Sequence, residues 1–430
     1  MIGGGYAGMA AAVELAARGV PVTVFESAKQ LGGRGRGVLY SPQSPENKAQ
    51  LDNGQHLLLG CYRETLRLIE LVGGDPARDF LRLPLQLELC GHFSLRAPSL
   101  PAPLHLLAAL LRAEGLSWAQ RGQATRLMLA LRRLDFRLAA DCSVADLLAR
   151  YGQDADLTLK LWEPLTLAAL NTPLQQASAQ VLLNVLRDSL HRRRADSDML
   201  LPRLDLTALF PQRAADYVSE QGGAVRLACP VEALRPAAQG FELQTASGSE
   251  TFAQVICATS PVAAAKLLRP LEALAATLAT IDALQYQPIY TVYLRYPAAV
   301  SLPQAMIGLY QRHSQWLFDQ GKISGQPGLI ASVISAAGQH QLLSHAELAQ
   351  RVAAELGELF AIKPPPLWHK VIAEKRATFA CDAGLLRPAR QTALSGLWLA
   401  GDYTAGDYPA TLEGAVRSGI CCAKEILNGA

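Results

Sequence analysis

The apolar positions at the start of the chain occur in a regular order. Ala10–Arg18 is a run of mostly small and apolar residues that predicts a helix, and Gly19 stands where a helix cap belongs. Val22–Phe25 is a continuous apolar run of the length of a buried strand, and Glu26 follows it. A helix that leads into a buried strand predicts an α/β unit at the N-terminus.

Farther along the chain, the apolar pattern predicts further strands and helices. The runs typical of strands are Gly222–Leu227, Val255–Thr259 and Leu397–Ala400. Leu104–Leu111 is strongly apolar, and Arg126–Leu138 has the spacing of an amphipathic helix. One line of that predicted helix holds arginines and the neighbouring line holds leucines, namely Arg126, Arg133 and Arg137 beside Leu127, Leu131, Leu134 and Leu138.

Composition narrows the class of protein. Half of the 430 residues are hydrophobic and 18% are charged, which excludes a chain that is disordered throughout. A formal net charge of +3 is too small to indicate nucleic acid as a partner. No apolar run reaches the ~20 residues that a membrane-spanning helix needs.

The cysteines and histidines do not have the spacing of a metal site. No two of the 8 cysteines form a C-x-x-C pair, and none stands beside a histidine at a zinc-ligand interval. We expect reduced, buried thiols in a cytoplasmic protein. His340 and His345 lack carboxylate companions at metal spacing, so we expect both at the surface and predict no bound metal.

A glycine-rich loop precedes the first predicted helix. Gly3–Gly8 reads G-x-G-x-x-G, and together with the helix, the strand and Glu26 it makes a dinucleotide-binding fingerprint. Gly3 and Gly5 allow a tight turn and the close approach of a pyrophosphate, while Gly8 allows the helix to pack closely on the strand. The N-terminus of the helix offers N–H groups to the phosphates, and Glu26 would accept a hydrogen bond from a ribose hydroxyl.

The strand that normally precedes such a loop is very short in this chain. Only Met1 and Ile2 come before Gly3. We therefore expect that the natural chain begins upstream of Met1. An upstream in-frame start encoding a short run rich in valine and isoleucine would support this expectation.

Leu31–Arg36 resembles the second FAD signature of the amine oxidase and carotenoid desaturase superfamily. It consists of a glycine pair that ends at Gly33, followed by Arg34. In that family the arginine neutralises pyrophosphate charge. The resemblance therefore implies that Gly33 and Arg34 bind the cofactor.

The C-terminal segment resembles the closing FAD motif of the same family. It begins with Gly401 and Asp402 after a predicted strand, and Tyr408–Gly419 then opens a helix. In the family, the aspartate contacts the ribityl chain of the flavin. The helix N-terminus, which Thr411 and Leu412 form in this chain, faces the pyrimidine end. The resemblance implies FAD rather than a nicotinamide dinucleotide.

The middle of the chain also fits the family. The two runs at Gly222–Leu227 and Val255–Thr259 are similar to the strand pair that lies by the adenine, which implies a backbone contact from Val231. We expect a discontinuous FAD-binding domain with a Rossmann-like α/β fold, built from residues 1–75, 205–262 and 395–430. An interleaved α+β substrate-binding domain with a helical, membrane-facing part is expected from residues 76–204 and 263–394.

Three segments point to the enzymes of the superfamily that act on isoprenoids. The amine oxidase branch usually has a tyrosine at the position of Thr411. Asp52–Tyr62 is similar to the segment that passes the flavin ring in carotene desaturases. Together with Leu161–Pro173, it looks like the squalene-associated FAD enzymes, the hydroxysqualene dehydroxylases of bacterial squalene and hopanoid synthesis.

This resemblance implies reductive removal of the allylic hydroxyl of hydroxysqualene, with reduced FAD as the hydride donor. Protonation lets the hydroxyl depart as water and leaves a delocalised cation. The protein must therefore supply an acid, an apolar tunnel for a C30 chain, and exclusion of the water that would recapture the cation.

Three residues are candidates for that acid. His56 lies in the segment expected beside the flavin and titrates near neutral pH, although a hydrogen bond to the backbone or to the flavin is the alternative. Asp52 lies in the same segment, where a turn hydrogen bond or a pairing with Arg34 or Arg36 competes with catalysis. Glu163 stands in an apolar stretch where burial would keep it protonated, or it marks a helix end.

Several alternatives stay open at this stage. A carotenoid-type, phytoene-like desaturase transfers hydride in the opposite direction, and a non-catalytic lipid-binding escort on the same fold, as in Rab GDP-dissociation inhibitors, is a second class. The predicted basic helix either packs on the core with a solvated arginine edge or faces anionic lipid. We expect a cytoplasmic protein, peripheral on the inner face of the cytoplasmic membrane. Upstream squalene-pathway enzymes are expected partners.

Overall fold

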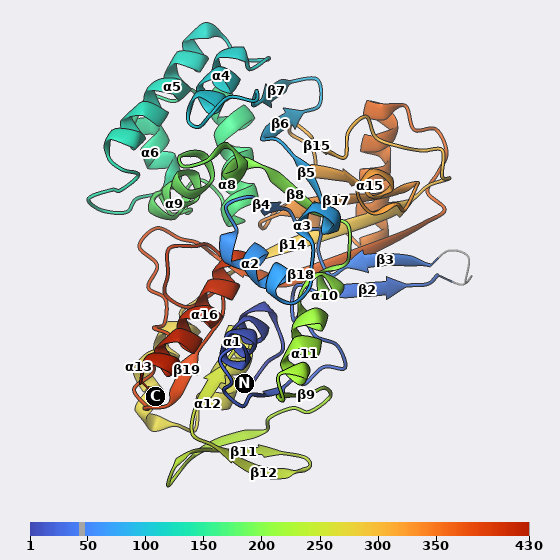
Figure 1. Cartoon of the computed structure of the whole chain (residues 1–430). Helices are drawn as coiled ribbons and strands as arrows, with labels where there is room; N and C mark the ends of the chain where they lie inside the picture. The colour runs from blue at the N-terminus through green and yellow to red at the C-terminus, as the bar shows by residue number, and fades with distance from the viewer. Residues whose placement is uncertain (43–47, 430) are drawn as a thin grey trace.

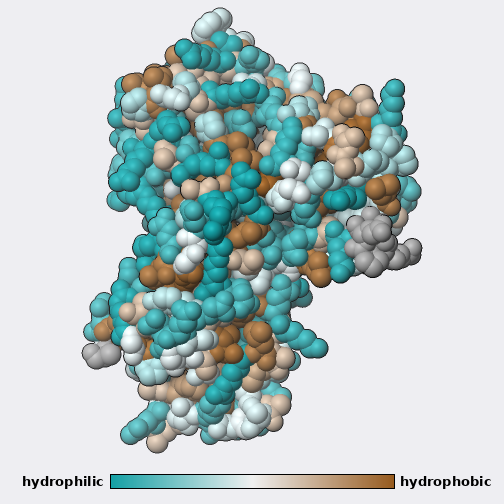
Figure 2. Space-filling view, turned by 45° about the vertical axis from the view of Figure 1, so that its right-hand side comes forward, coloured by the Kyte–Doolittle hydropathy of each residue, from teal (hydrophilic) through white to brown (hydrophobic). Residues whose placement is uncertain are grey.

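The computed structural model describes residues 1–42 and 48–429. A narrow waist separates a lower lobe, which carries both termini, from a wider upper lobe (Figures 1 and 2). The upper lobe has a helical part and a part that is built on a large sheet (Figure 1).

A parallel sheet assembled from distant parts of the chain forms the centre of the lower lobe. β1 (Thr23–Phe25) pairs with β9 (Ala224–Arg226), and β13 (Val255–Cys257) pairs with β19 (Leu397–Leu399). Ile2 lies between the two pairs and bridges β1 on one side and β13 on the other. The residues before the glycine loop thus occupy the middle of this sheet.

The strand pair predicted beside the adenine is wrong in one respect, because β9 and β13 are not neighbours. Ile2 and β1 stand between them. In the sequence, an antiparallel meander lies between β9 and β13, and through it the chain crosses from one side of the parallel sheet to the other. The meander consists of β10 (Ala233–Ala237), β11 (Gly240–Thr245) and β12 (Gly248–Phe252).

The helices of the lower lobe pack around α1 (Tyr6–Ala16), all of whose residues are buried. A helix that is apolar on all sides is stable only when it is covered on all sides. Its neighbours are α11 (Pro211–Glu220) and α16 (Leu412–Gly429). The helix predicted at Ala10–Arg18 is therefore observed at Tyr6–Ala16, so it begins and ends earlier in the chain than expected. α12 (Pro261–Leu268) and α13 (Ala275–Asp282) follow β13.

A mixed sheet supports the other part of the upper lobe. Its strand order is β18-β14-β17-β16-β15-β6-β7. α15 (His345–Phe360) packs against it through Leu348, Val352 and Leu356. The strands are β6 (Gln86–Leu89), β7 (Phe93–Arg96), β14 (Tyr286–Arg295), β15 (Met306–Gly308), β16 (Trp316–Asp319), β17 (Leu329–Ser335) and β18 (Trp368–Phe379).

The helical part comprises residues of the first predicted insertion. Its helices are α4 (Leu104–Arg112), α5 (Trp118–Arg133), α6 (Val144–Arg150), α7 (Ala155–Leu157), α8 (Glu163–Leu170) and α9 (Ala179–Leu190). The predicted amphipathic helix to Leu138 is too long. It stops at Arg133 because Asp135 and Phe136 have positive φ angles of 49° and 55°, which a right-handed helix excludes.

Short elements connect the two lobes. β2 (Gly37–Tyr40) and β3 (Ala49–Asp52) form a hairpin, and β8 (Met199–Pro202) pairs with both β4 (Leu58–Leu59) and β5 (Phe80–Leu83). The remaining helices are α2 (Arg63–Leu71), α3 (Pro76–Asp79), α10 (Leu206–Leu209) and α14 (Gln320–Ser324). The division into domains at the residues given above stays a prediction.

Candidate functional site

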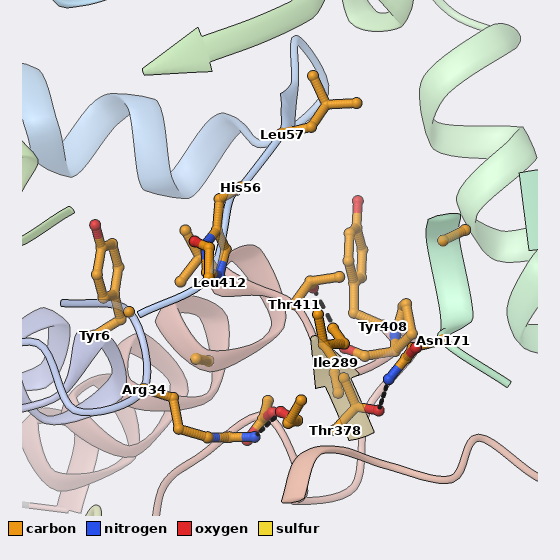
Figure 3. Close-up of a pocket in the computed structure, with 18 of the residues that line it drawn as sticks. Tyr6, Arg34, His56, Leu57, Asn171, Ile289, Thr378, Tyr408, Thr411 and Leu412 are labelled. Carbon is orange, nitrogen blue, oxygen red and sulfur yellow. Dashed lines mark hydrogen bonds and ion pairs between the residues drawn. The ribbon is translucent and has the colours of Figure 1, made fainter. Parts of the chain in front are cut away.

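One cavity of about 1010 Å³ reaches from the lower lobe into the upper lobe. Its lower end, which we call the cofactor end, is lined by Gly3, Gly5, Glu26, Gly33 and Val231. The opposite end, which we call the apolar arm, is lined by Leu87, Leu106, Leu110, Met128, Leu186 and Phe318. Between them lies a polar belt formed by His56, Asn171, Thr378, Tyr408 and Thr411 (Figure 3).

The cofactor end has the shape that a dinucleotide requires. Gly5 precedes α1, and no side chain from the described part of the chain caps the first turn of this helix, so its N–H groups are available to phosphate oxygens. A Cβ atom at Gly8 would lie 2.0 Å from the carbonyl oxygen of Gly3, so only glycine allows this turn. Gly8 itself does not line the cavity, in keeping with its packing role.

Glu26 stands at the end of β1, and its two oxygens are held by the backbone. The Gly4 N–H donates to Oε2 at 2.7 Å, and the Ala28 N–H donates to Oε1 at 2.8 Å. These bonds fix the carboxylate in the wall of the cofactor end. A carboxylate that is held in this way retains free lone pairs for a ribose hydroxyl.

Arg34 and Asp402 meet in the cavity wall, although 368 residues separate them in sequence. The guanidinium of Arg34 donates to Asp402 and also to the carbonyl oxygen of Ala377 at 2.6 Å. Asp402 is buried, so this ion pair compensates for the loss of its hydration. The neighbouring Gly401 lines the cavity as well.

The start of α16 closes the cofactor end from another side. Thr411 and Leu412 both line the cavity. The Thr411 hydroxyl accepts a hydrogen bond from the Gly414 N–H at 3.1 Å, and therefore caps the helix rather than pointing freely into the space. The helix N-terminus consequently faces the cavity with its positive dipole end.

His56 lines the polar belt, in the segment where the sequence predicted a catalytic group (Figure 3). Its Nδ1–H donates to the carbonyl oxygen of Gly54 at 2.6 Å, which leaves Nε2 as an acceptor in the neutral ring. Burial lowers the pKa of His56, and the positive charge of Arg34 lowers it further. The neutral form dominates at neutral pH, so His56 is an acceptor rather than an acid there.

The other two candidate acids lie outside the cavity wall. Asp52 accepts a hydrogen bond from the Leu206 N–H at 2.9 Å, so it caps α10 instead of pairing with Arg34 or Arg36. Burial raises its pKa to about 8. Glu163 is the first residue of α8, and burial raises its pKa also. Burial was expected to keep Glu163 protonated, whereas no pKa change was predicted for Asp52, and neither carboxyl group lines the cavity.

Three residues of the polar belt, Asn171, Thr378 and Tyr408, had no predicted role. Asn171 ends α8 in a left-handed conformation, and its amide donates to the Thr378 hydroxyl at 3.0 Å while accepting from the Ala336 N–H at 2.7 Å. Tyr408 donates to Asp188 at 2.8 Å. Asn171 and Tyr408 lie within segments that resemble the family, yet their hydrogen-bond partners are too distant in sequence to be predicted.

Comparison with known proteins settles the family. The profile of flavin containing amine oxidoreductases matches residues 6–427. The chain belongs to this family. A crystal structure of an oxidoreductase from Methanosarcina mazei has a TM-score of 0.73 and 16% sequence identity, and the match covers 99% of each chain. The predicted α/β FAD-binding fold is therefore confirmed.

Two relatives of this flavoprotein bear names that concern isoprenoids. The hydroxysqualene dehydroxylase of Rhodopseudomonas palustris is 29% identical, and the match covers 99% of this chain and 97% of the relative. The zeta-carotene desaturase of Arabidopsis thaliana is 24% identical, with 99% of this chain and 86% of the relative covered. The resemblance to squalene-associated and carotenoid enzymes is confirmed.

Family membership makes the protein an FAD-dependent oxidoreductase, so the predictions of an enzyme and of FAD are confirmed. The residues at the cofactor end fit this cofactor. The glycine loop and Glu26 have the groups that the adenosine diphosphate half requires, whereas the charge of Arg34 is paired with that of Asp402. The alternative of a non-catalytic escort protein is set aside.

Other expectations are resolved by the described residues. All eight cysteines are free thiols. The surface location predicted for His340 is wrong, because its ring packs edge-on against Tyr290 with centroids 4.8 Å apart and only 4% is exposed. His345 is exposed at the start of α15. Within residues 1–42 and 48–429, no helix has the length and apolarity needed to cross a bilayer.

Proposed function

We propose that this flavoenzyme reduces hydroxysqualene to squalene in bacterial squalene and hopanoid biosynthesis. The observation that carries the proposal is the joining of an apolar arm to the cofactor end through a polar belt. A long hydrocarbon with one hydroxyl group matches that distribution of polarity. The full-length similarity to hydroxysqualene dehydroxylase supports the same substrate.

The net change breaks one allylic C–O bond and forms one C–H bond. The hydroxyl group takes up one proton from the medium and leaves as water, and a reductant must supply the two electrons of the hydride. Bound FAD supplies the hydride chemistry. The residues of the chain have three tasks, namely to hold the hydrocarbon, to keep bulk water away from the allylic carbon, and to orient the hydroxyl.

The apolar arm carries out the first two tasks. Leu87, Leu106, Leu110 and Phe318 come from the sheet and from the helical part, and together they enclose the arm. Burial of each CH₂ group of a substrate contributes about 0.8 kcal/mol, so a C30 chain gains most of its affinity there. The same packing excludes water from the site of the cation.

We assign orientation of the hydroxyl to His56 rather than delivery of the proton. The neutral ring presents Nε2 as an acceptor, because Nδ1–H is bound to Gly54. A substrate hydroxyl that donates to Nε2 would be held at the polar belt. Asp52 and Glu163 are proposed as supporting groups only, since neither lines the cavity.

Carotenoid-type desaturation is the second candidate. The observation in its favour is the same neutral His56, since a proton acceptor suits removal of a proton from a polyene better than protonation of a leaving group. The similarity to zeta-carotene desaturase supports it as well. The two candidates differ in the redox state of FAD that they require.

Anaerobic turnover with each redox state separates the candidates. The purified protein with FAD and dithionite should convert hydroxysqualene into squalene, detected by gas chromatography and mass spectrometry. With oxidised FAD it should leave phytoene and zeta-carotene unchanged in their absorption spectra. Polyene desaturation without squalene formation would reverse the assignment.

A matched pair of variants tests His56. His56→Gln should raise KM and lower kcat/KM by about 10-fold or more, the scale of one hydrogen bond in a buried site. His345→Gln makes the same change on the exposed start of α15 and should leave turnover unaltered. If His56→Gln turns over hydroxysqualene like the wild type while FAD stays bound, His56 has no role with the substrate.

We further propose that the enzyme works at the inner face of the cytoplasmic membrane, where its substrate and product accumulate. Enzymes that form hydroxysqualene would then act on the same membrane. Fractionation of cells followed by immunodetection would test this location.

A further inference from the structure

Large hydrophobic side chains are exposed in one region of the upper lobe. Seven of the fourteen large apolar side chains that stand out as exposed among the described residues lie between residues 100 and 134. Figure 1 shows α4 and α5 at the end of this lobe that is farthest from the termini. Four of these seven form what we call the apolar ridge, namely Leu104 (53%), Leu107 (38%), Leu111 (44%) and Trp118 (75%).

The ridge follows helical spacing. Leu104, Leu107 and Leu111 are three and four residues apart, so they share one face of α4. Trp118 opens α5 and continues the surface, and the guanidinium of Arg121 lies 4.5 Å from the centre of its ring. A tryptophan in this setting has the apolar body and polar edge that suit a membrane–water interface.

The adjoining face of the same helix lines the cavity. Leu106 and Leu110 belong to the apolar arm, and Met128 of α5 joins them. α4 is therefore apolar on two adjoining faces, one of which lines the arm while the other forms the exposed ridge. A helix in contact with water on one side does not need leucines there for its stability.

Positive charge surrounds the ridge. Residues 100–137 contain six arginines and only two acidic residues, Glu114 and Asp135. None of the six forms an ion pair with a carboxylate in residues 1–42 or 48–429, and Arg121 is half-buried, which leaves five others, namely Arg112, Arg126, Arg132, Arg133 and Arg137. All five are exposed. Unpaired arginines beside exposed leucines and a tryptophan are typical of a surface that enters an anionic bilayer.

We propose that the apolar ridge docks on an anionic phospholipid membrane, and that the lipid substrate passes between α4 and α5 into the apolar arm. The passage of substrate rests on the proposed function, whereas the docking does not. Charge complementarity selects the occupant, because a second copy of this chain would bring two sets of unpaired arginines against each other. An uncharged partner would leave those arginines without a counter-charge.

Vesicle co-sedimentation without substrate tests the docking. The flavin-loaded wild type should bind vesicles of phosphatidylglycerol and phosphatidylcholine, and bind pure phosphatidylcholine vesicles more weakly. Leu104→Ser, Leu107→Ser and Leu111→Ser combined should lower the partition coefficient by at least about tenfold, because three apolar side chains no longer enter the acyl region. None of the three leucines lines the cavity, so FAD content should be unchanged.

Two further variants make the test specific. The combined change Leu342→Ser, Leu367→Ser and Leu386→Ser alters three leucines that are exposed elsewhere, at 80%, 60% and 81%, and should bind vesicles like the wild type. Arg126→Gln, Arg132→Gln and Arg133→Gln combined should abolish the preference for phosphatidylglycerol. High salt should have the same effect on the wild type.

Separate readouts distinguish failure of the docking from failure of the proposed function. Squalene formation from detergent-dispersed hydroxysqualene should be the same in wild type and ridge variant, whereas only the wild type should be stimulated by vesicles. Absence of vesicle binding by the wild type, or equal loss in the control variant, overturns the docking. A wild-type dimer that the ridge variant converts to monomers also overturns it, since the ridge would then be covered by a second copy.

Discussion

Two aspartates, Asp52 and Asp205, meet at the start of α10, and they accept hydrogen bonds from different N–H groups of this helix. Asp205 accepts hydrogen bonds from the N–H groups of Thr207 and Ala208, at 3.0 Å and 3.1 Å, as a helix cap does. Asp52 comes from β3 and accepts from the Leu206 N–H. Burial is the main cause that raises the pKa of Asp52 to about 8, and the charge of Asp205 contributes.

The raised pKa predicts how stability depends on pH. Between about pH 4 and 8 the folded protein holds a proton on Asp52 that the unfolded chain has released, so the free energy of unfolding falls as pH rises. The slope for one full proton is about 1.4 kcal/mol per pH unit. The amide of Asp52→Asn does not titrate, so the free energy of unfolding of this variant should fall less with rising pH than that of the wild type. Urea unfolding at several pH values would measure the difference.

A surface aspartate provides the control for this measurement. Asp75 also caps a helix, α3, through the Ala77 N–H, but it is exposed. Asp75→Asn should change stability by a similar amount at every pH in this range. Parallel curves for wild type and Asp52→Asn would show that Asp52 is ionised in the folded protein.

Among single residues, the sequence could predict those whose partners lie close to them in the chain. The glycine loop, Glu26 and His56 were found because their neighbours in sequence create the motif. Asn171 and Tyr408 escaped prediction because their hydrogen-bond partners, Ala336 and Asp188, lie 165 and 220 residues away. Asp52 and Glu163 show the converse, since an acidic residue in a promising segment does not reveal which way its side chain points.

Among the secondary-structure elements, the contact of α1 with α16 controls the cofactor end most directly. The first turn of α1 and the first turn of α16 both line it. The two helices approach closely at Gly419, where a Cβ atom would lie 2.1 Å from the carbonyl oxygen of Ala7. A carbonyl oxygen in a helix cannot move aside, so the whole of α16 would have to shift.

Gly419→Ala should therefore destabilise the protein by about 1–3 kcal/mol and reduce the FAD that co-purifies with it. Gly122→Ala is the matched control, because Gly122 lies inside α5 and a Cβ atom there meets nothing within 4 Å. It should stabilise the protein by about 0.5–1 kcal/mol through its better helix propensity. Thermal unfolding and the flavin-to-protein absorbance ratio measure both effects. Equal flavin content in the two variants would contradict the role given to this helix contact.

The ends of elements were harder to predict than their existence. α1 and β1 lie where the apolar pattern indicated, and α16 lies where the resemblance to the closing FAD motif implied a helix. The helix expected up to Leu138 ends at Arg133, since Asp135 and Phe136 turn the backbone left-handed. Helical spacing of leucines continues past that point, so periodicity alone gives no sign of the stop.

The whole molecule is organised around a cavity to which segments far apart in sequence contribute. Gly3, Glu26, Val231 and Asp402 line one end, and the helical part and large sheet line the other. The parallel sheet that supports the cofactor end depends on strands from four parts of the chain. Sequence motifs could indicate this interleaving, but not that the two lobes would share one continuous space.

Because distant segments line the cofactor end, we expect bound FAD to stabilise the folded protein. FAD that contacts the Gly3 loop, Glu26, Val231 and Asp402 together would bind only when these segments are in place, so it stabilises the folded state alone. The stabilisation is about 2.7 kcal/mol at a free concentration 100 times Kd. Removing FAD should lower Tm and make the lower lobe more sensitive to proteolysis, and re-adding FAD should reverse both changes.

A comparison of FAD with FMN and adenosine diphosphate tests whether this stabilisation comes from the whole cofactor end. FMN lacks the adenosine half that Glu26 and Val231 are expected to hold, so an equal concentration of FMN should restore less of Tm than FAD does. Adenosine diphosphate occupies that half alone, and it should protect the lower lobe from proteolysis while leaving Tm below that of the FAD complex. Full protection by FMN would mean that the flavin half alone holds these segments together, and that the adenosine contacts assigned to Glu26 and Val231 contribute little.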